Sequence, residues 1–231
     1  DYYASRGLGD VYKRQVRKVG DEVIINENNV VMCDFRQGDL IPFDIAIHGA
    51  LMKSGNDAAA VLALFAADNM SDAVALMNKE AKSLGATESN FVNPHGLYND
   101  NHYTTAYDLY LIFNEAIKYS KFVDTLSCMK YTGSFTRKTA YGDYSIGCSY
   151  TNSNGFLTGS YATPDGIKVY GGKAGYTEVA RRSYVMLAES NNGHKYIIIT
   201  MRAESNSLMY KDLSALLNKI PVDKKSYADN E

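Results

Sequence analysis

The spacing of apolar residues changes near residue 130, and this change limits the folds that the chain can adopt. Over residues 40–125 the apolar side chains recur at helical spacing, which predicts a helical block. After residue 130 they come in short extended runs, at Ile167–Tyr170, Tyr184–Leu187 and Tyr196–Met201. Asn192-Gly193, between the last two runs, predicts a hairpin turn, and residues 208–220 predict a closing helix. Helices, then antiparallel strands, then a helix indicate an α+β fold, because parallel βαβ units would alternate.

Local signals predict where several helices begin and end. Pro42 stands where a helix can start, and Ser54-Gly55 should end it just before a second, buried helix that Asn56 or Asp57 can cap. Ser71 is a favoured N-cap for a third helix. Thr105 and Asp108 are spaced like a capping box, with Asp in place of the usual Glu.

Length and charge exclude several classes of protein. A chain of 231 residues, 45% of them hydrophobic, can bury one sizeable core, and its formal net charge of -2 offers no cationic excess for a phosphate backbone. The longest apolar run, Ala58–Ala67, is well short of the roughly 20 residues that a membrane-spanning helix needs. We therefore expect no nucleic-acid partner, and membrane association only through segments outside this sequence.

The same patterns divide the chain into a main domain and two short ends. Residues 1–15 show neither strand alternation nor a helical stripe, and we expect them to be a non-native segment. Residues 16–220 are the predicted domain, with a helical lobe over about 40–125 and a sheet part over about 130–220. Residues 221–231 are polar and charged and predict a tail.

Neither the cysteines nor the histidines form a recognisable metal or redox motif. The cysteines are few and scattered, no Cys-x-x-Cys occurs, and we expect three free thiols: Cys33, Cys128 and Cys148. His95 is held between Pro94 and Gly96, with Asp100 and His102 nearby, but the spacing matches no zinc pattern. We expect no metal and no cofactor, and a structural role for His95.

Two short segments carry side chains suited to catalysis or binding. At Ser54-Gly55-Asn56, a hydroxyl that can relay a proton lies two residues from an amide that can hold a substrate amide. The alternative is a turn with a capping function. At Gly171–Thr177, Lys173 is flanked by glycines on a predicted edge strand, which leaves the backbone open to an extended peptide and the ammonium open to a carboxylate. The alternative is a kinked strand end with a solvated lysine.

Four motifs in a fixed order together resemble one family. They are Ser54-Gly55-Asn56-Asp57-Ala58-Ala59, Asn93-Pro94-His95-Gly96-Leu97, Tyr103-Thr104-Thr105-Ala106, and Gly172-Lys173-Ala174-Gly175-Tyr176-Thr177. This series resembles the low-molecular-weight penicillin-binding proteins, the serine-type D-alanyl-D-alanine carboxypeptidases of peptidase family S11, from about Val16 to Ile220. The resemblance implies a β-lactamase/transpeptidase-like fold, an antiparallel sheet flanked by helices with an all-helical lobe.

The resemblance also implies a role for each matched residue. The family places three motifs, Ser-x-x-Lys, Ser-x-Asn and Lys-Thr-Gly, around one cleft. Ser54 would pass a proton to the leaving amine and Asn56 would anchor the substrate's peptide bond. In the Lys173–Thr177 segment, Lys173 would bind the D-alanine carboxylate, with Ala174 and Gly175 completing the motif and Thr177 beside it. The Tyr176 N–H would be one oxyanion donor. The implied substrate is the D-Ala-D-Ala end of a peptidoglycan stem peptide, and β-lactams are the implied inhibitors.

The sequence departs from the family pattern in two places. Ala174 replaces the threonine whose hydroxyl helps to hold the carboxylate, and one hydrogen bond to a charged group is worth about 1.5–3 kcal/mol. The Ser-x-x-Lys motif normally precedes Ser-x-Asn by roughly 60 residues. Here that position falls before residue 1, so we expect the first strands and the nucleophile helix to be missing. The match at Ser127–Lys130 is in the wrong order and is interpreted as chance.

Several readings of the function stay open. The leading one is a D-Ala-D-Ala carboxypeptidase of the cell envelope, outside the cytoplasm, that lacks its nucleophile segment and is of doubtful activity as it stands. The second is a non-catalytic domain that binds peptidoglycan or β-lactams, which the Lys-Ala-Gly sequence favours. A class A β-lactamase is third, because Gly55 and the Asn93–Leu97 loop do not match its motifs. A metallopeptidase comes last.

Overall fold

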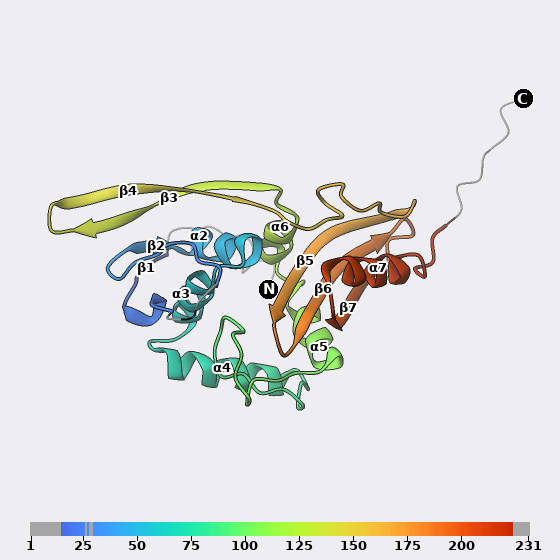
Figure 1. Ribbon diagram of the computed structural model, residues 1–231, viewed down its shortest axis with the longest axis horizontal. Helices are drawn as coiled ribbons and strands as arrows, with labels where there is room; N and C mark the ends of the chain where they lie inside the picture. Colours follow the sequence, from blue (N-terminus) through green and yellow to red (C-terminus); the bar gives the residue numbers. More distant parts are fainter. Residues whose placement is uncertain (1–14, 26, 28–29, 224–231) are drawn as a thin grey trace, which may run out of the picture. The chain divides into compact units, whose positions relative to one another are not determined.

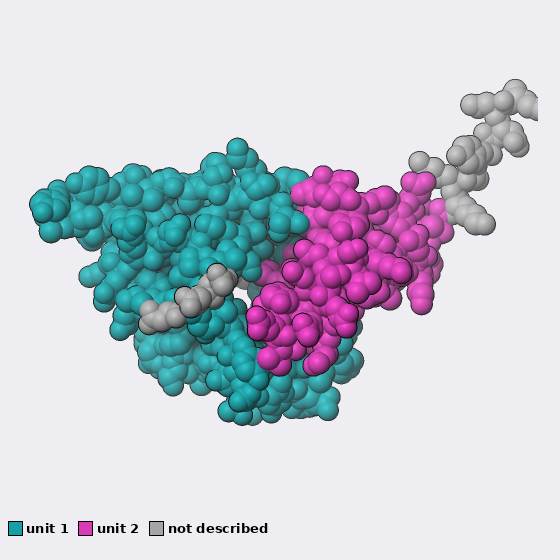
Figure 2. Space-filling model, in the orientation of Figure 1, with its two compact units in different colours: residues 1–153 teal, residues 154–231 magenta. Residues whose placement is uncertain are grey.

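The computed structural model describes residues 15–25, 27 and 30–223 and confirms the α+β fold (Figure 1). It divides the chain into two compact units, residues 1–153 and 154–231 (Figure 2). The ends expected to lie outside the domain, residues 1–15 and 221–231, fall mostly outside the described residues. Each unit is built around its own antiparallel sheet.

The sheet of unit 1 has the strand order β1-β2-β3-β4. Its strands are β1 (Val16–Lys18), β2 (Leu40–Pro42), β3 (Lys130–Thr139) and β4 (Gly142–Thr151). The pairing of Leu40 with Thr136 joins the start of the helical region to the long β3–β4 hairpin. This pairing explains why the compact units divide after Ser153, although the secondary structure changes from helix to strand at Lys130.

The helices of unit 1 follow β2 directly. A short 3₁₀ turn, η1 (Asp21–Val23), precedes β2, and the helical elements after it are α2 (Phe43–His48), the π-turn η2 (Gly49–Lys53), α3 (Asn56–Ala66), α4 (Met70–Ser83), α5 (Ala106–Ala116) and α6 (Ser120–Ser127). Pro42 is the N-cap of α2, as its fixed φ predicts. Helix α3 buries most of its first three turns, which agrees with its almost wholly apolar sequence.

Of the predicted helix caps, Thr105 is confirmed and Ser71 is wrong. Thr105 caps α5, as predicted, with its hydroxyl accepting from the Asp108 N–H at 3.1 Å. The Asp108 carboxylate accepts instead from the Glu88 N–H at 2.9 Å and the Ser89 hydroxyl at 2.6 Å. The prediction of Ser71 as the cap of α4 is wrong, because the cap is Asn69. The Asn69 side chain accepts from the Asp72 N–H at 2.9 Å and also donates to the Asp72 carboxylate at 2.7 Å. An amide can do both at once, whereas Ser71 is the second residue of α4 and already lies inside its first turn.

Unit 2 is a three-stranded sheet of order β5-β6-β7 with one helix on a face. Its elements are β5 (Ile167–Thr177), β6 (Arg181–Ser190), β7 (Lys195–Ala203) and α7 (Asn206–Leu217). Gly193 has φ 84° in the turn between β6 and β7, so the hairpin predicted at Asn192-Gly193 is confirmed. The buried side chains between sheet and helix form one cluster that includes Met186, Ile198 and Leu213.

No single helix in the part of the chain that the structure describes has the length and apolar character needed to cross a membrane. Helices α3 and α4 meet the length and composition limits only when taken together, and the two are bent by 80° at the break between them.

A buried ion pair fixes the β3–β4 hairpin to the segment before β2. The Asp39 side chain is 1% exposed, and Arg137 of β3 binds it through Nε at 3.0 Å and Nη2 at 2.8 Å. Arg137 Nη2 also donates to the Asp34 carbonyl at 2.8 Å, and the Arg36 N–H donates to the Asp39 carboxylate at 2.9 Å. Removal of one partner would leave a buried charge without its counter-ion, which is costly.

We expect Arg137→Ala to lower the free energy of unfolding by about 3–5 kcal/mol, because it leaves the Asp39 carboxylate buried and unpaired. Chemical denaturation of the whole chain measures this. Lys138→Ala is the matched control on the next residue, since Lys138 and Asp143 are both well exposed and 3.5 Å apart. The control should cost less than about 1 kcal/mol. Equal losses in the two variants would contradict the role given to the pair.

Candidate active site

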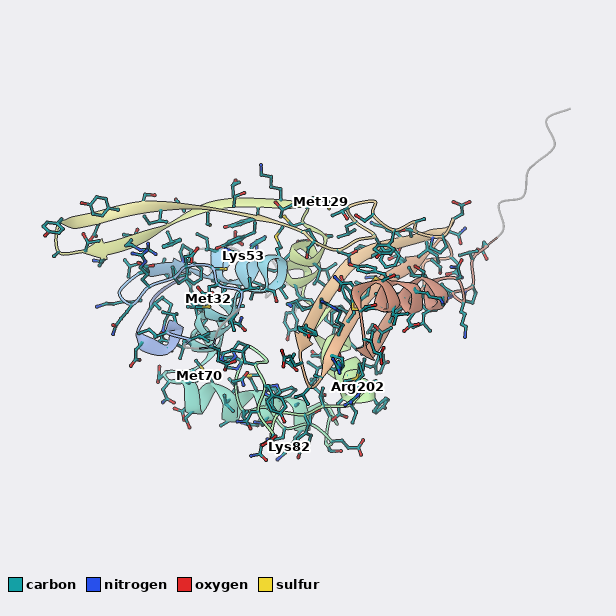
Figure 3. The ribbon with its side chains drawn as sticks, viewed as in Figure 1. Met32, Lys53, Met70, Lys82, Met129 and Arg202 are labelled. Carbon is teal, nitrogen blue, oxygen red and sulfur yellow. The ribbon has the colours of Figure 1, made fainter. Side chains whose placement is uncertain are left out.

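The Ser54 junction has a strained backbone. Ser54 ends the π-turn η2 with φ 63° and ψ 34°, the left-handed conformation that residues other than glycine adopt at a cost of about 1–3 kcal/mol. Its side chain is exposed, as is that of Lys53, the residue before it, which Figure 3 labels. Such strain persists only where the surroundings impose it, and it is common at functional sites.

The buried Asp57 carboxylate supports the backbone conformation of the Ser54 junction. It is fully buried on the first turn of α3 and accepts hydrogen bonds from the Cys33 N–H at 2.8 Å and the Phe35 N–H at 3.0 Å. A third bond comes from the Ala58 N–H at 2.8 Å. Burial raises the pKa of Asp57, and the three N–H donors oppose this rise. The carboxylate therefore holds the segment 31–35 against the start of α3.

Asn56 is bound to the same segment. Its backbone N–H and its side-chain Nδ2 both donate to the Val31 carbonyl, each at 2.9 Å. The Asn56 residue is 9% exposed, so its amide is fixed in one orientation. One Nδ2 hydrogen is used in this bond, and the amide has a second Nδ2 hydrogen and an Oδ1 acceptor.

Close packing around Cys33 explains the two glycines of the junction. A Cβ on Gly55 would lie 2.4 Å from the Cys33 Sγ, and a Cβ on Gly49 would lie 2.8 Å from the same atom. Cys33 is buried, and desolvation raises the pKa of its thiol to about 12. The thiol is therefore protonated at neutral pH and fills space between the two helices. This agrees with the expectation of a free thiol at Cys33.

The Asn93–Leu97 loop is closed by its own side chains. Asn93 accepts from the Gly96 N–H at 2.7 Å and donates to the Leu97 carbonyl at 3.0 Å, while Gly96 has φ 76°. His95 Nδ1 accepts from the Leu97 N–H at 3.3 Å, and burial lowers the pKa of this histidine. Among the described residues, no group of three or more His, Cys, Asp or Glu side chains is placed to hold a metal ion.

The Lys173 segment lies on an edge strand, as predicted. Within the described residues, β5 pairs only with β6, with Lys173 opposite Val185 and Tyr176 opposite Arg182. Gly172 is required by close approach, because a Cβ there would lie 2.2 Å from the Val185 carbonyl oxygen. Ala174, Gly175 and Tyr176 are exposed and Thr177 is half-buried. The guanidinium of Arg182 lies 4.7 Å from the centre of the Tyr176 ring.

Lys173 is the most strongly perturbed cation of this segment. Its side chain is half-buried, and its ammonium donates to the Ala174 carbonyl. Desolvation lowers the pKa of Lys173 from 10.5 to about 8. The group is therefore mainly cationic at neutral pH, but with less hydration to lose when an anion binds.

The Ser-x-x-Lys match at Ser127–Lys130 has no catalytic geometry of that motif. Ser127 is the last residue of α6 and Lys130 is the first residue of β3, so the two are not one turn apart on a helix. The Ser127 hydroxyl donates back to the Val123 carbonyl at 3.1 Å. A nucleophile activated by Lys130 is not supported by this arrangement.

The structure places the expected site residues in two groups. Ser54 and Asn56 share the junction in unit 1, and Lys173–Thr177 share strand β5 in unit 2. The prediction that Asn56 or Asp57 caps α3 is wrong, because the N-cap is Gly55. The role of Asp57 as a buried acceptor was not predicted from the sequence. A carboxylate at the start of an otherwise apolar, buried helix was the signal for it, since buried charges are normally paired or hydrogen-bonded.

Comparison with known proteins gives a consistent result. The family model for D-alanyl-D-alanine carboxypeptidase, Peptidase_S11, matches residues 5–205. The D-alanyl-D-alanine carboxypeptidase DacF of Bacillus subtilis is 33% identical over 151 residues, which are 64% of this chain and 34% of that protein. DacA of Escherichia coli is 32% identical over 155 residues, 63% of this chain and 34% of that protein. The chain thus spans about a third of the length of these relatives.

Solved structures share the fold at lower identity. Penicillin binding protein 5 of Haemophilus influenzae aligns with a TM-score of 0.74 and 22% identity over 94% of this chain and 59% of that one. A D-alanyl-D-alanine carboxypeptidase of Mycobacterium tuberculosis aligns with a TM-score of 0.71 and 24% identity over 91% of this chain and 75% of that one. The transpeptidase-like fold implied by the motifs is confirmed.

The strain at Ser54 gives a test of the junction. We expect Ser54→Gly to be more stable than Ser54→Ala by about 1 kcal/mol, because both lack the hydroxyl but only glycine adopts positive φ without a steric cost. Thermal or denaturant unfolding of the two variants measures the difference. Asn56 lies in the helix, so Asn56→Gly should instead be less stable than Asn56→Ala. Equal stability of the two Ser54 variants would contradict a left-handed Ser54.

Proposed function

Because the chain belongs to the D-alanyl-D-alanine carboxypeptidase family, peptidase family S11, we propose that it serves in removing the terminal D-alanine from peptidoglycan stem peptides. The proposed reaction is hydrolysis through a serine acyl-enzyme that water resolves. The observation that carries the proposal is the pair of segments, Ser54-Gly55-Asn56 and Lys173-Ala174-Gly175, each held in a rigid setting inside its own unit. The proposed location is the cell envelope, outside the cytoplasm, where this substrate occurs.

We assign Ser54 and Asn56 to the part of the reaction around the scissile bond. An exposed hydroxyl on a fixed, left-handed residue supports a role for Ser54 in passing a proton to the leaving D-alanine amine. The fixed Asn56 amide supports anchoring of the substrate's peptide bond through Oδ1 and the second Nδ2 hydrogen. The nucleophile of the family, the serine of Ser-x-x-Lys, is not among these residues.

We assign the β5 segment to the end of the substrate. The Lys173 ammonium would bind the terminal carboxylate, and its reduced hydration lowers the cost of that contact. The open edge of β5 would pair with the extended peptide, with Gly175 leaving space beside it and the Tyr176 N–H as an oxyanion donor. Thr177 lies at the end of the same strand. Ala174 has no hydroxyl to add to the carboxylate contact, and β-lactams, which also carry a carboxylate, are proposed ligands.

The role of Lys173 is tested by comparing two peptides that both end in D-Ala-D-Ala, one with a free carboxylate and one amidated. We expect the chain to prefer the free carboxylate at pH 7, and Lys173→Gln to weaken its binding about tenfold or more, since a hydrogen bond to a charged group is worth about 1.5–3 kcal/mol. Isothermal titration measures both affinities. Lys168→Gln, on the same strand, is the control and should leave the preference unchanged.

The preference for the free carboxylate should fall as the pH rises. The Lys173 ammonium loses its proton as the pH rises through about 8. The preference for the free carboxylate should therefore be full near pH 6 and fall above pH 8, well before an ordinary lysine titrates near 10.5. A preference that persists to pH 10, or that Lys173→Gln leaves intact, would contradict the assignment.

A second candidate is a non-catalytic domain that binds peptidoglycan or β-lactams. The observation that favours it is Ala174, because the Lys-Ala-Gly sequence lacks the hydroxyl of the usual Lys-Thr-Gly. Binding without turnover would need the carboxylate contact at Lys173 but no activated serine.

Fluorescent penicillin tests the assignment of the nucleophile. We expect this chain to take up no covalent label, because Ser127 donates its hydroxyl to a helix carbonyl and Lys130 lies on the next strand. Denaturing gel electrophoresis followed by peptide mapping measures the label. Ser127→Ala is the matched variant, and label that disappears in it would show that Ser127 is the nucleophile and that our interpretation is wrong.

A longer gene product that contains an upstream Ser-x-x-Lys should label if it is the enzyme, and should bind without labelling if the second candidate is correct.

A further inference from the structure

A buried polar turn stands at the start of unit 2. Asn154 is 3% exposed, and its Oδ1 accepts from the Phe156 N–H at 2.9 Å and the Leu157 N–H at 3.2 Å. The next residue, Gly155, donates its N–H to the Tyr210 hydroxyl of α7 at 2.8 Å. The turn is therefore anchored both by its own asparagine and by the helix that covers the sheet. These bonds hold Asn154 in place independently of its contact with the sheet.

Asn154 also contacts the sheet through a short hydrogen bond. Asn154 Nδ2 donates to the hydroxyl of Tyr184 on β6 at 2.6 Å, and both residues are buried. A buried hydroxyl left without a partner costs about 1–3 kcal/mol, so loss of the bond would be destabilising. The bond fixes the rotation and the depth of the Tyr184 ring.

The Tyr184 ring in turn contacts the strand that carries Lys173. Tyr184 lies opposite Ala174 in the β5–β6 register. Its Cε1 atom would be 2.5 Å from a Cβ on Gly172, so the ring occupies the place of a side chain at that position. Gly172 is covalently joined to Lys173. A shift of the ring would therefore be passed to the backbone from which the Lys173 side chain extends.

We propose that Asn154 and Tyr184 form a positioning pair that sets where the Lys173 ammonium lies. The proposal rests on the function given above to Lys173, and it adds two residues that do not themselves touch the substrate. A phenylalanine at position 184 would fill the same space, and its lack of a hydroxyl would allow the ring to move relative to Asn154. The hydrogen bond between the Tyr184 hydroxyl and the Asn154 amide is directional, so it fixes the ring more closely than apolar packing alone would.

The test is a titration of Lys173 in the whole chain by NMR, with the Cε carbons of lysine labelled and the Lys173 signal assigned by its loss in Lys173→Gln. In the unchanged chain we expect a midpoint near 8. Tyr184→Phe should move the midpoint toward 10.5, because a displaced ammonium regains water. It should also reduce the preference for the free carboxylate over the amidated D-Ala-D-Ala peptide. Thermal unfolding is followed in parallel.

The matched control is Tyr170→Phe. Tyr170 lies on β5 itself, and its hydroxyl donates to the Glu189 carboxylate at 3.0 Å, where β6 is paired with Lys168 and not with Gly172. This variant removes one tyrosine hydroxyl from the same sheet and should leave the Lys173 midpoint unchanged. Asn154→Ala should move the midpoint in the same direction as Tyr184→Phe, and the double variant should add nothing to either change, since the two residues act as a unit.

The outcomes separate the two proposals. If Tyr184→Phe lowers the unfolding temperature but leaves the Lys173 midpoint in place, the pair only stabilises the core and the positioning role is wrong. If the midpoint moves but even the unchanged chain shows no preference for the free carboxylate, the positioning role stands and the proposed function fails. If Asn154→Ala does not fold, Tyr184→Phe decides alone, because it keeps the ring in the core.

Discussion

The buried carboxylate of Asp57 is the interaction on which unit 1's candidate site depends. It joins two segments that are 24 residues apart, through bonds from the Cys33 and Phe35 N–H groups to the first turn of α3. Those bonds hold the Val31 carbonyl against Asn56 and the Cys33 thiol against Gly49 and Gly55. Ser54, between this segment and the helix, adopts the left-handed conformation. The buried hydrogen bonds of Asp57 thus hold the backbone next to Ser54 and compensate for its strained conformation.

Unit 2 achieves a similar rigidity by other means. Its motif lies on an edge strand, where a pairing partner exists on one side only within the described sheet. The strand is held instead by close packing, since Gly172 lies against the Val185 carbonyl and the Tyr184 ring. The strand therefore keeps one edge open, within the described sheet, while close packing holds its other side. The two units therefore offer different chemistry, a hydroxyl and amide in one and a cation with an open backbone in the other, each on a fixed support.

The electrostatic state of Lys173 fits a ligand that is an anion. An ammonium with its pKa lowered to about 8 keeps its charge at neutral pH, but it has already lost part of its hydration. A carboxylate that contacts it therefore displaces less water and gains more from the charge. The family to which the chain belongs is defined by action on a peptide that ends in a carboxylate. In the proposed function, Ala174 would leave this contact to Lys173 and the backbone.

The sequence by itself determined those features that depend on near neighbours. The change from helix to strand, the Thr105 cap and the hairpin at Asn192-Gly193 all follow from spacing within a few residues. The Ser71 cap failed because Asn69, two residues earlier, competed for the same helix turn. Only the tertiary structure decided which distant groups meet: the Asp57 bonds span 24 and 22 residues and the Asn154–Tyr184 bond spans 30. Spacing along a chain records local geometry, whereas the partner of a buried polar group is set by packing of segments that the fold brings together.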